Sequence, residues 1–184
     1  MSATGIAHGR VNLLGEHTDY NDGYVLPTAI PQATRVAVEA AADATFLVEA
    51  RDLHEHARFT LDTPPSEHFA TYVYGCVREL ATRTDVPPLR FSIHSEVPMG
   101  VGLSSSAALE VATLRALRTL LEVALDDVSL ALMAQRAENR YAGVQCGVLD
   151  QMASSLGAPG SMLFLDTRTF QRRVLPLPAD AEVL

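Results

Sequence analysis

The chain has 184 residues, of which 48% are hydrophobic and 20% are charged, so it can bury an apolar core and suits one domain. Its formal net charge of -8 and the lack of a basic run exclude a general attraction to nucleic acid or to an anionic membrane. Cys76 and Cys146 lie far apart, and the sequence shows neither a signal peptide nor an apolar run of about 18 residues. We therefore expect a globular, cytoplasmic protein without a disulfide scaffold, in which any phosphate binding is local.

Hydrophobic periodicity predicts an α+β fold. Runs with alternating apolar residues predict strands, whereas apolar residues three to four positions apart predict helices. The expected strands cover residues 11–14, 24–27 onward, 33–41, 45–50, 58–61, 89–96, 162–166 and 171–177. The expected helices cover residues 68–82, 105–123, 128–142 and 150–156. From this pattern we expect a mostly antiparallel sheet with the helices on one face.

A dense polar stretch, residues 15–23, separates the first two expected strands. Glu16, His17 and Asp19 follow directly after a buried strand, where binding residues are often found. Such short donors and acceptors suit a sugar-like ligand, because each hydroxyl both donates and accepts a hydrogen bond. The alternative is a solvated hairpin loop, and we expect residues 21–23 to be turn chemistry of that kind.

Residues 98–108 combine glycines with three serines at the start of an expected helix. Gly100 and Gly102 allow positive φ and a close approach to an anion, and a helix starting near Ser104 would point its free N–H groups there. This pattern predicts a phosphate-binding loop in which a hydroxyl ligates Mg²⁺. It differs from the common P-loop, because no Lys follows the last glycine. The alternative is a glycine-rich turn with a serine N-cap.

Two carboxylates further along the chain allow two interpretations each. Glu138 either points into a cleft, since it lies beside the apolar stripe of its helix, or lies on a solvated helix face between Arg136 and Arg140, and the residues alone favour the solvated face. Asp150 follows a glycine-containing loop, where it serves either in a site or as a favourable charge at a helix N-terminus.

Three segments carry a resemblance to a known family. Residues 9–21 (GRVNLLGEHTDYN) resemble the galactokinase signature, and residues 146–151 (CGVLDQ) resemble the galactokinase segment with the catalytic aspartate. Residues 98–108 (PMGVGLSSSAA) resemble the second motif of the superfamily of galactokinase, homoserine kinase, mevalonate kinase and phosphomevalonate kinase. The three segments occur in the family's order, and the resemblance implies the ribosomal protein S5 domain 2-like architecture.

The resemblance also implies roles for individual residues. Arg10 would stand near the reacting hydroxyl and the transferred phosphoryl group, and Asp150 would face the anomeric hydroxyl as a base or as an electrostatic positioner. Galactose would be held by side chains of Glu16, His17 and Asp19 and by the backbone of Gly147. The phosphates of ATP would be held by the backbone of Gly100, Val101, Gly102, Leu103, Ser104, Ser105 and Ser106. Mg²⁺ would be ligated by Ser106 and Glu138.

The implied reaction is ATP-dependent phosphorylation of galactose to galactose 1-phosphate. Two alternatives remain: a related kinase of N-acetylgalactosamine or arabinose, and a non-catalytic sensor that binds galactose and ATP. His8 stands where the family usually has Pro. The resemblance ends near the end of the family's N-terminal domain, so we expect residues 1–178 to form that domain and 179–184 to begin a linker. A missing C-terminal domain would complete the cleft, and the isolated chain would be weak or inactive as a kinase.

Overall fold

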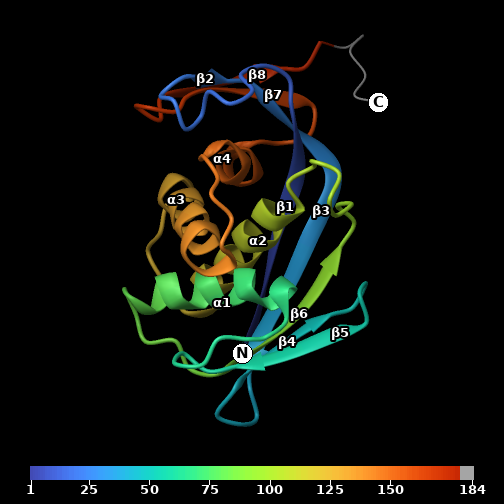
Figure 1. Cartoon of the computed structure of the whole chain (residues 1–184), viewed down its shortest axis with the longest axis vertical. Coiled ribbons are helices and arrows are strands. Elements are labelled where there is room, and N and C mark those ends of the chain that lie inside the picture. Colours follow the sequence, from blue (N-terminus) through green and yellow to red (C-terminus); the bar gives the residue numbers. More distant parts are fainter. Residues whose placement is uncertain (179–184) are drawn as a thin grey trace.

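The computed structural model describes residues 1–178, and the predicted linker, 179–184, lies outside the described residues. The elements follow one another along the chain as strands, then alternating helices and strands (Figure 1). Strands are β1 (Ser2–Asn12), β2 (Tyr24–Val25), β3 (Pro27–Ala40), β4 (Phe46–Ala50), β5 (Glu55–Phe59), β6 (Leu89–Ser95), β7 (Ser161–Asp166) and β8 (Arg172–Pro176). Helices are α1 (His68–Ala81), α2 (Ser105–Leu120), α3 (Asp127–Ala137), the π-helix η1 (Glu138–Ala142) and α4 (Leu149–Leu156).

The strands form one sheet in the order β2-β7-β3-β6-β4-β5, with β1 beside β3 and β8 beside β7. Every paired strand runs antiparallel to its neighbour except β4 and β6, which are parallel. The helices pack on one face of this curved sheet, and β2, β7 and β8 lie across one end of the helical layer (Figure 1). The predicted α+β class with a mostly antiparallel sheet is therefore confirmed.

The main core lies between the sheet and α1, α2 and α3. Phe91 on β6, Leu114 and Leu117 on α2 and Met133 on α3 are all fully buried. These helical residues recur every three to four positions, which explains why each segment folds as a helix with one face on the sheet. Each such side chain contributes about 1.5–3 kcal/mol by leaving water, so the helix positions are firmly set.

Strand β1 is longer than the sequence predicted. It begins at Ser2, not near Val11, and pairs with β3 from Ser2 to Asn12. The first half of β1 consists mostly of small residues, so it lacks the apolar alternation that predicts a strand. Close packing against α2 leaves little space there for large side chains. The register shifts between His8 and Arg10. Such bulges re-aim a side chain, and this one directly precedes Arg10.

The predicted helix 128–142 is also interrupted. α3 ends at Ala137, and residues Glu138 to Ala142 form a π-helical turn that ends at Gly143 with φ 74°. A π-turn places one extra residue in the turn and so changes which side chains share a face.

Candidate functional site

Three segments that are far apart in the sequence meet at one carboxylate. The Arg10 Nε and Nη2 atoms both donate to Asp150 Oδ1, at 2.8 and 2.6 Å. The Ser104 hydroxyl donates to Asp150 Oδ2 at 2.6 Å, and Arg10 Nη1 donates to the Gly102 carbonyl at 2.6 Å. The end of β1, the glycine-serine segment and the first turn of α4 are thereby joined by side-chain hydrogen bonds.

The glycine-serine loop, residues 98–104, has the backbone of an anion-binding loop. Gly100, Gly102 and Ser104 have φ of 73°, 80° and 56°. A Cβ at either glycine would find no atom of the described residues within 4 Å, so this face of the loop is open. The Ser104 side chain makes no capping hydrogen bond to α2, because its hydroxyl goes to Asp150. The serine N-cap alternative is therefore wrong, and the N-terminus of α2 keeps its positive dipole end for another partner.

Beside Asp150 lies a small polar hollow of about 180 Å³. Its walls come from β1, the loop after β1, and the segment leading into α4. They comprise Arg10, Asn12, Glu16, His17, Asp19, Tyr20, Cys146, Gly147, Leu149 and Asp150. The structure thus brings together all the residues predicted for sugar binding. Three carboxylates in the walls favour a neutral ligand that donates hydrogen bonds over an anion.

Local contacts hold the walls of this polar hollow. The Asp19 Oδ2 atom accepts a hydrogen bond from the Leu149 N–H at 3.2 Å. A Cβ on Gly147 would clash with that same oxygen, so a larger residue there would displace the Asp19 carboxylate. His17 has a positive φ of 60°, and its Nδ1 lies 2.6 Å from the Tyr20 hydroxyl. A bulky residue in this conformation is strained, and such strain concentrates at functional sites.

Glu138 lies behind the glycine-serine loop and is only 4% exposed. The expectation of a solvated helix face is therefore wrong. Glu138 lies on the buried side of the helix beside Ala134 and Ala137, whereas Arg136 and Arg140, four residues apart, pair with Glu79 on α1. Burial raises the pKa of Glu138, and hydrogen bonds from the Ser106 hydroxyl and the Cys146 thiol partly oppose that shift.

Ser106 and Glu138 together fit a magnesium ion. They offer a hydroxyl oxygen and a carboxylate oxygen at the N-terminus of α2, and these hard oxygen ligands suit Mg²⁺. Within residues 1–178, no group of three or more His, Cys, Asp and Glu side chains is arranged to hold a metal ion. Mg²⁺ is commonly held by one or two carboxylates together with substrate phosphates, as this donor set would require.

Comparisons with known proteins agree with this geometry. The model of the GHMP kinases N terminal domain matches residues 71–158, and that of the galactokinase galactose-binding signature matches residues 3–40. A galactokinase from Lactococcus lactis, solved with galactose, is 30% identical with a TM-score of 0.87. The match covers 95% of this chain and 47% of that one. The chain belongs to the GHMP kinases.

More distant structures share the fold of this GHMP kinase chain. A D-glycero-D-manno-heptose 1-phosphate kinase from Bacteriodes thetaiotaomicron is 20% identical with a TM-score of 0.76, covering 96% of this chain and 60% of that one. The mevalonate kinase of Methanococcus jannaschii is 16% identical with a TM-score of 0.74, covering 94% and 55%. The chain thus spans about half the length of the solved kinases that it matches.

Sequence reasoning missed an apolar cavity of about 610 Å³ beside Ser105 and Ser106. Its lining includes Phe69 and Tyr72 on α1 and Leu109 on α2. Burial raises the pKa of the Tyr72 hydroxyl. Part of its lining, Gly100, Ser105 and Ser106, belongs to the glycine-serine motif, but Phe69 and Tyr72 stand in a segment without a motif, so the sequence did not predict a cavity. The polar hollow also contains Tyr20, which the sequence left without a role.

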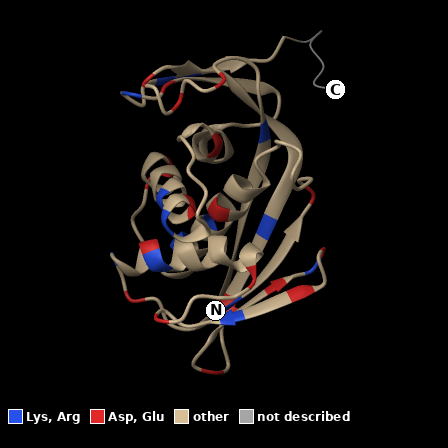
Figure 2. Ribbon diagram, in the orientation of Figure 1, with Lys and Arg blue, Asp and Glu red and all other residues tan. Residues whose placement is uncertain are grey.

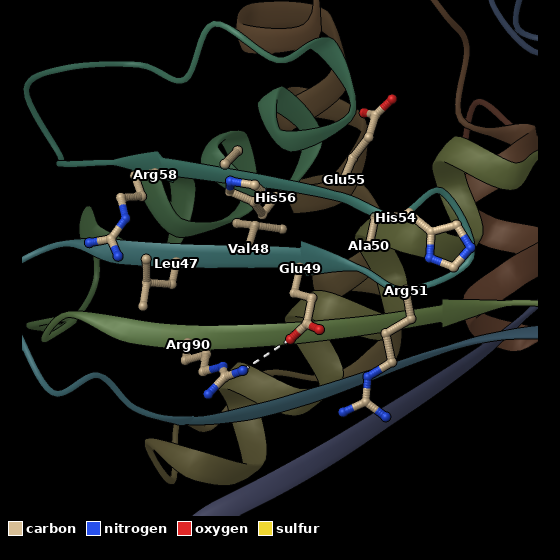
Figure 3. A pocket seen from close by; sticks show the side chains of 11 residues that line it. Leu47, Val48, Glu49, Ala50, Arg51, His54, Glu55, His56, Arg58 and Arg90 are labelled. Atoms are coloured by element: carbon tan, nitrogen blue, oxygen red, sulfur yellow. Dashed lines mark hydrogen bonds and ion pairs between the residues drawn. The ribbon is translucent and has the colours of Figure 1, made fainter.

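A larger hollow of about 780 Å³ lies on the outer face of the sheet, over β4, β5 and β6 (Figure 3). It contains none of the predicted site residues. Its side chains include Glu49 and Arg90, which form an ion pair at 3.0 Å across neighbouring strands. An antiparallel sheet commonly has one solvated face, and cross-strand charge pairs are typical of it. We assign this hollow to that solvated face.

Outside the site, the chain carries charges of both signs. Arginines and acidic residues are interspersed along both the sheet and the helices in Figure 2. None of the helices in the described part of this GHMP kinase chain is long and apolar enough to cross a membrane.

Proposed function

We propose that this GHMP kinase chain supplies the sugar- and phosphate-binding half of a galactokinase, which phosphorylates galactose with ATP. The observation that carries the proposal is the convergence of Arg10 and Asp150 between the polar hollow and the glycine-serine loop. One side of this pair suits a polyhydroxylated ligand and the other suits an anion. A sugar kinase needs those two sites next to each other. The matching galactose-binding signature supports galactose as the sugar.

Asp150 is placed to act on the hydroxyl that reacts. In the proposed step, the anomeric oxygen of galactose forms a bond to the γ-phosphorus of ATP as the bond to the leaving ADP oxygen breaks. The hydroxyl proton goes to Asp150, whose side chain is 29% exposed and lines the polar hollow. Arg10 holds Asp150 in place and adds positive charge beside the transferred group. Positioning and charge stabilisation, not covalent chemistry, do most of the work in such a transfer.

We assign ATP to the open face of the glycine-serine loop. The N-terminus of α2 would face its phosphates, and the apolar cavity lined by Phe69, Tyr72 and Leu109 has the size and character for the nucleoside. Ser106 and Glu138 would hold Mg²⁺, which neutralises phosphate charge when bound. The rest of the cleft, and thus turnover, depends on the half of the relatives that this chain does not cover.

The proposal is tested first by binding. Calorimetric titration of the 184-residue chain with galactose should give saturable binding, and glucose, which differs in one hydroxyl configuration, should bind more weakly. Asp19→Asn should weaken galactose binding about 10-fold or more, because it changes an acceptor in the wall of the polar hollow into a partial donor. Asp22→Asn is the matched control, since Asp22 is exposed on the same loop and lies outside the lining.

Turnover is tested separately, with ADP release coupled to NADH oxidation, on the chain and on any longer product of the same reading frame. Asp150→Asn should lower galactose-dependent turnover by about 10²–10⁴-fold, the range for loss of a general base. Saturable galactose binding without turnover in any form would favour the sensor alternative. Binding of another sugar in preference to galactose would instead favour a related sugar kinase.

A further inference from the structure

A buried polar cluster lies one helical turn behind the glycine-serine loop. It consists of Glu110 on α2, Glu138 at the start of η1 and Gln151 on α4. Glu110 and Gln151 are 0% exposed, and Glu138 is 4% exposed. Polar groups at this depth are costly unless they are hydrogen-bonded, so their contacts are informative.

One amide nitrogen connects the two carboxylates of this buried cluster. Gln151 Nε2 donates to Glu138 Oε2 at 2.5 Å and to Glu110 Oε2 at 3.3 Å. The amide carbonyl oxygen of Gln151 and the Oε1 atom of Glu110 have no hydrogen-bond partner among the described residues. The hydrogen bonds of the cluster therefore concentrate on the Glu138 oxygen, which the Cys146 thiol also approaches at 3.5 Å.

The buried cluster also connects the elements that carry the candidate site. Glu110 lies four residues after Ser106 on α2, so both occupy one helix face, one turn apart. Gln151 directly follows Asp150 in the first turn of α4. Glu138 is itself a candidate ligand. The Gln151 amide thus contacts one side chain on α2 and one on η1. The positions of α2, η1 and α4 relative to one another set the geometry of the candidate metal ligands and of Asp150.

We propose that Gln151 is a positioning residue that fixes the Glu138 carboxylate toward Ser106, so that metal binding with the nucleotide depends on the Gln151 amide. This inference rests on the proposed function, because the metal belongs to the phosphoryl-transfer site. Residues that hydrogen-bond a metal ligand set its orientation, and their loss typically lowers metal affinity about 10–100-fold. A residue that merely fills the core would be replaced by an apolar side chain of similar volume without that effect.

The test compares two buried residues of the same helix. Gln151→Met keeps the volume and removes the amide, whereas Ser154→Ala alters a hydroxyl that is 1% exposed and has no partner among the described residues. Mn²⁺, titrated by electron paramagnetic resonance in the presence of the ATP analogue AMPPNP, serves as the probe on the 184-residue chain. Thermal unfolding confirms that each variant is folded, and AMPPNP is also titrated without metal.

We expect Gln151→Met to raise the Kd of Mn²⁺ at least about 10-fold and Ser154→Ala to change it by less than about twofold. The affinity for metal-free AMPPNP should stay equal in the parent and both variants, which a general loss of structure would not allow. If Gln151→Met does not fold, Glu110→Met removes the second support of the amide and should raise the Kd about threefold.

Each contrary result has a distinct meaning. A folded Gln151→Met chain with the parent's Mn²⁺ affinity overturns the positioning role and leaves the proposed function intact. An equal loss of metal-free AMPPNP affinity shows that Gln151 supports only the loop, and it also overturns the inference. A parent chain that binds neither AMPPNP nor its Mn²⁺ complex overturns the proposed function and this inference with it.

Discussion

Two buried glutamates on neighbouring helices differ in the charge of the groups that donate hydrogen bonds to them. Glu79 on α1 is 3% exposed and accepts hydrogen bonds from Arg136 Nε and Arg140 Nη1, at 2.8 and 2.9 Å. Glu110 on α2 is 0% exposed and forms no ion pair among the described residues, where a neutral amide is its side-chain donor. Burial raises the pKa of Glu110 well above its usual value, with the nearby Glu138 carboxylate adding to the shift.

The difference separates a carboxylate that is paired with cations of its own chain from one that is not. Glu79 is satisfied by cations of its own chain, so its region is complete without a ligand. Glu110 and Glu138 form no ion pair among the described residues, and their shared side-chain donor is the Gln151 amide. A buried carboxylate without a cationic partner is costly, and the raised pKa of Glu110 means that burial favours its neutral form.

The largest loss of stability is expected when the two arginines that pair with Glu79 are replaced. Arg136→Met together with Arg140→Met keeps the apolar stems but leaves Glu79 buried without a cation, which should cost about 3–5 kcal/mol of unfolding free energy. Urea unfolding followed by circular dichroism measures this loss. Adding Glu79→Met to the double variant should restore most of the stability, because all three charges are then gone. A double variant within about 1 kcal/mol of the parent would remove the basis of the comparison.

Replacing each glutamate by glutamine should give a smaller loss of stability, which differs between Glu79 and Glu110. Glu79→Gln removes the charge from two charge-assisted hydrogen bonds and should cost about 1.5–3 kcal/mol. Glu110→Gln retains an oxygen to accept from Gln151 and should cost at most about 1 kcal/mol. Both are measured by urea unfolding at neutral pH. Equal costs for the two changes would show that Glu110 depends on its charge as Glu79 does.

The sequence predicted the parts of the site that lie within short motifs. The residue types of the glycine-serine loop indicate anion binding, whereas the roles of Arg10 and Asp150 came from the resemblance of their segments to galactokinase motifs. The structure confirms that they meet, with Ser104 between Arg10 and Asp150 in the hydrogen-bond network. The α+β class followed from hydrophobic periodicity, because alternation and helical spacing survive in most segments.

What the sequence did not predict depends on register and on distant contacts. Glu138 lies between two arginines in the sequence, but at two positions from each along a regular helix it faces away from both of them. Its burial depends on packing against α2 and α4, which no local pattern marks. The bulge before Arg10 arises from pairing with β3, and the apolar cavity combines Tyr72 with residues that lie far away along the chain. Tertiary packing determines these features, so the local sequence does not predict them.

The smallest effect on stability is expected from substitutions of Asp126, an exposed carboxylate at the N-cap of α3. It is compensated by backbone N–H groups, because its Oδ1 accepts from the N–H groups of Val128 and Ser129 at 3.0 Å each. Hydrogen bonds from the Ser129 hydroxyl and N–H lower the pKa of Asp126 below its ordinary 3.8, against a weak opposing effect of burial. A lowered pKa in the folded state means that the unfolded chain takes up the proton first as the pH falls. The stabilisation by this charge is therefore present above about pH 3.8 and is lost as the pH falls through the folded-state pKa.

Two substitutions at Asp126 separate its charge from its capping geometry. Asn is also a good N-cap residue, so Asp126→Asn removes the charge and keeps the cap, whereas Asp126→Ala removes both. At pH 7 we expect stability to decrease from the parent to Asn and then to Ala, as measured by urea unfolding. In acid the parent is neutral at this position too, so the gap between the parent and Asn should close while the gap between Asn and Ala persists. A gap between the parent and Asn that stays constant with pH would mean that the charge of Asp126 contributes nothing. Asp126 would then act through its capping hydrogen bonds alone, unlike Glu79, whose carboxylate is paired with two arginines.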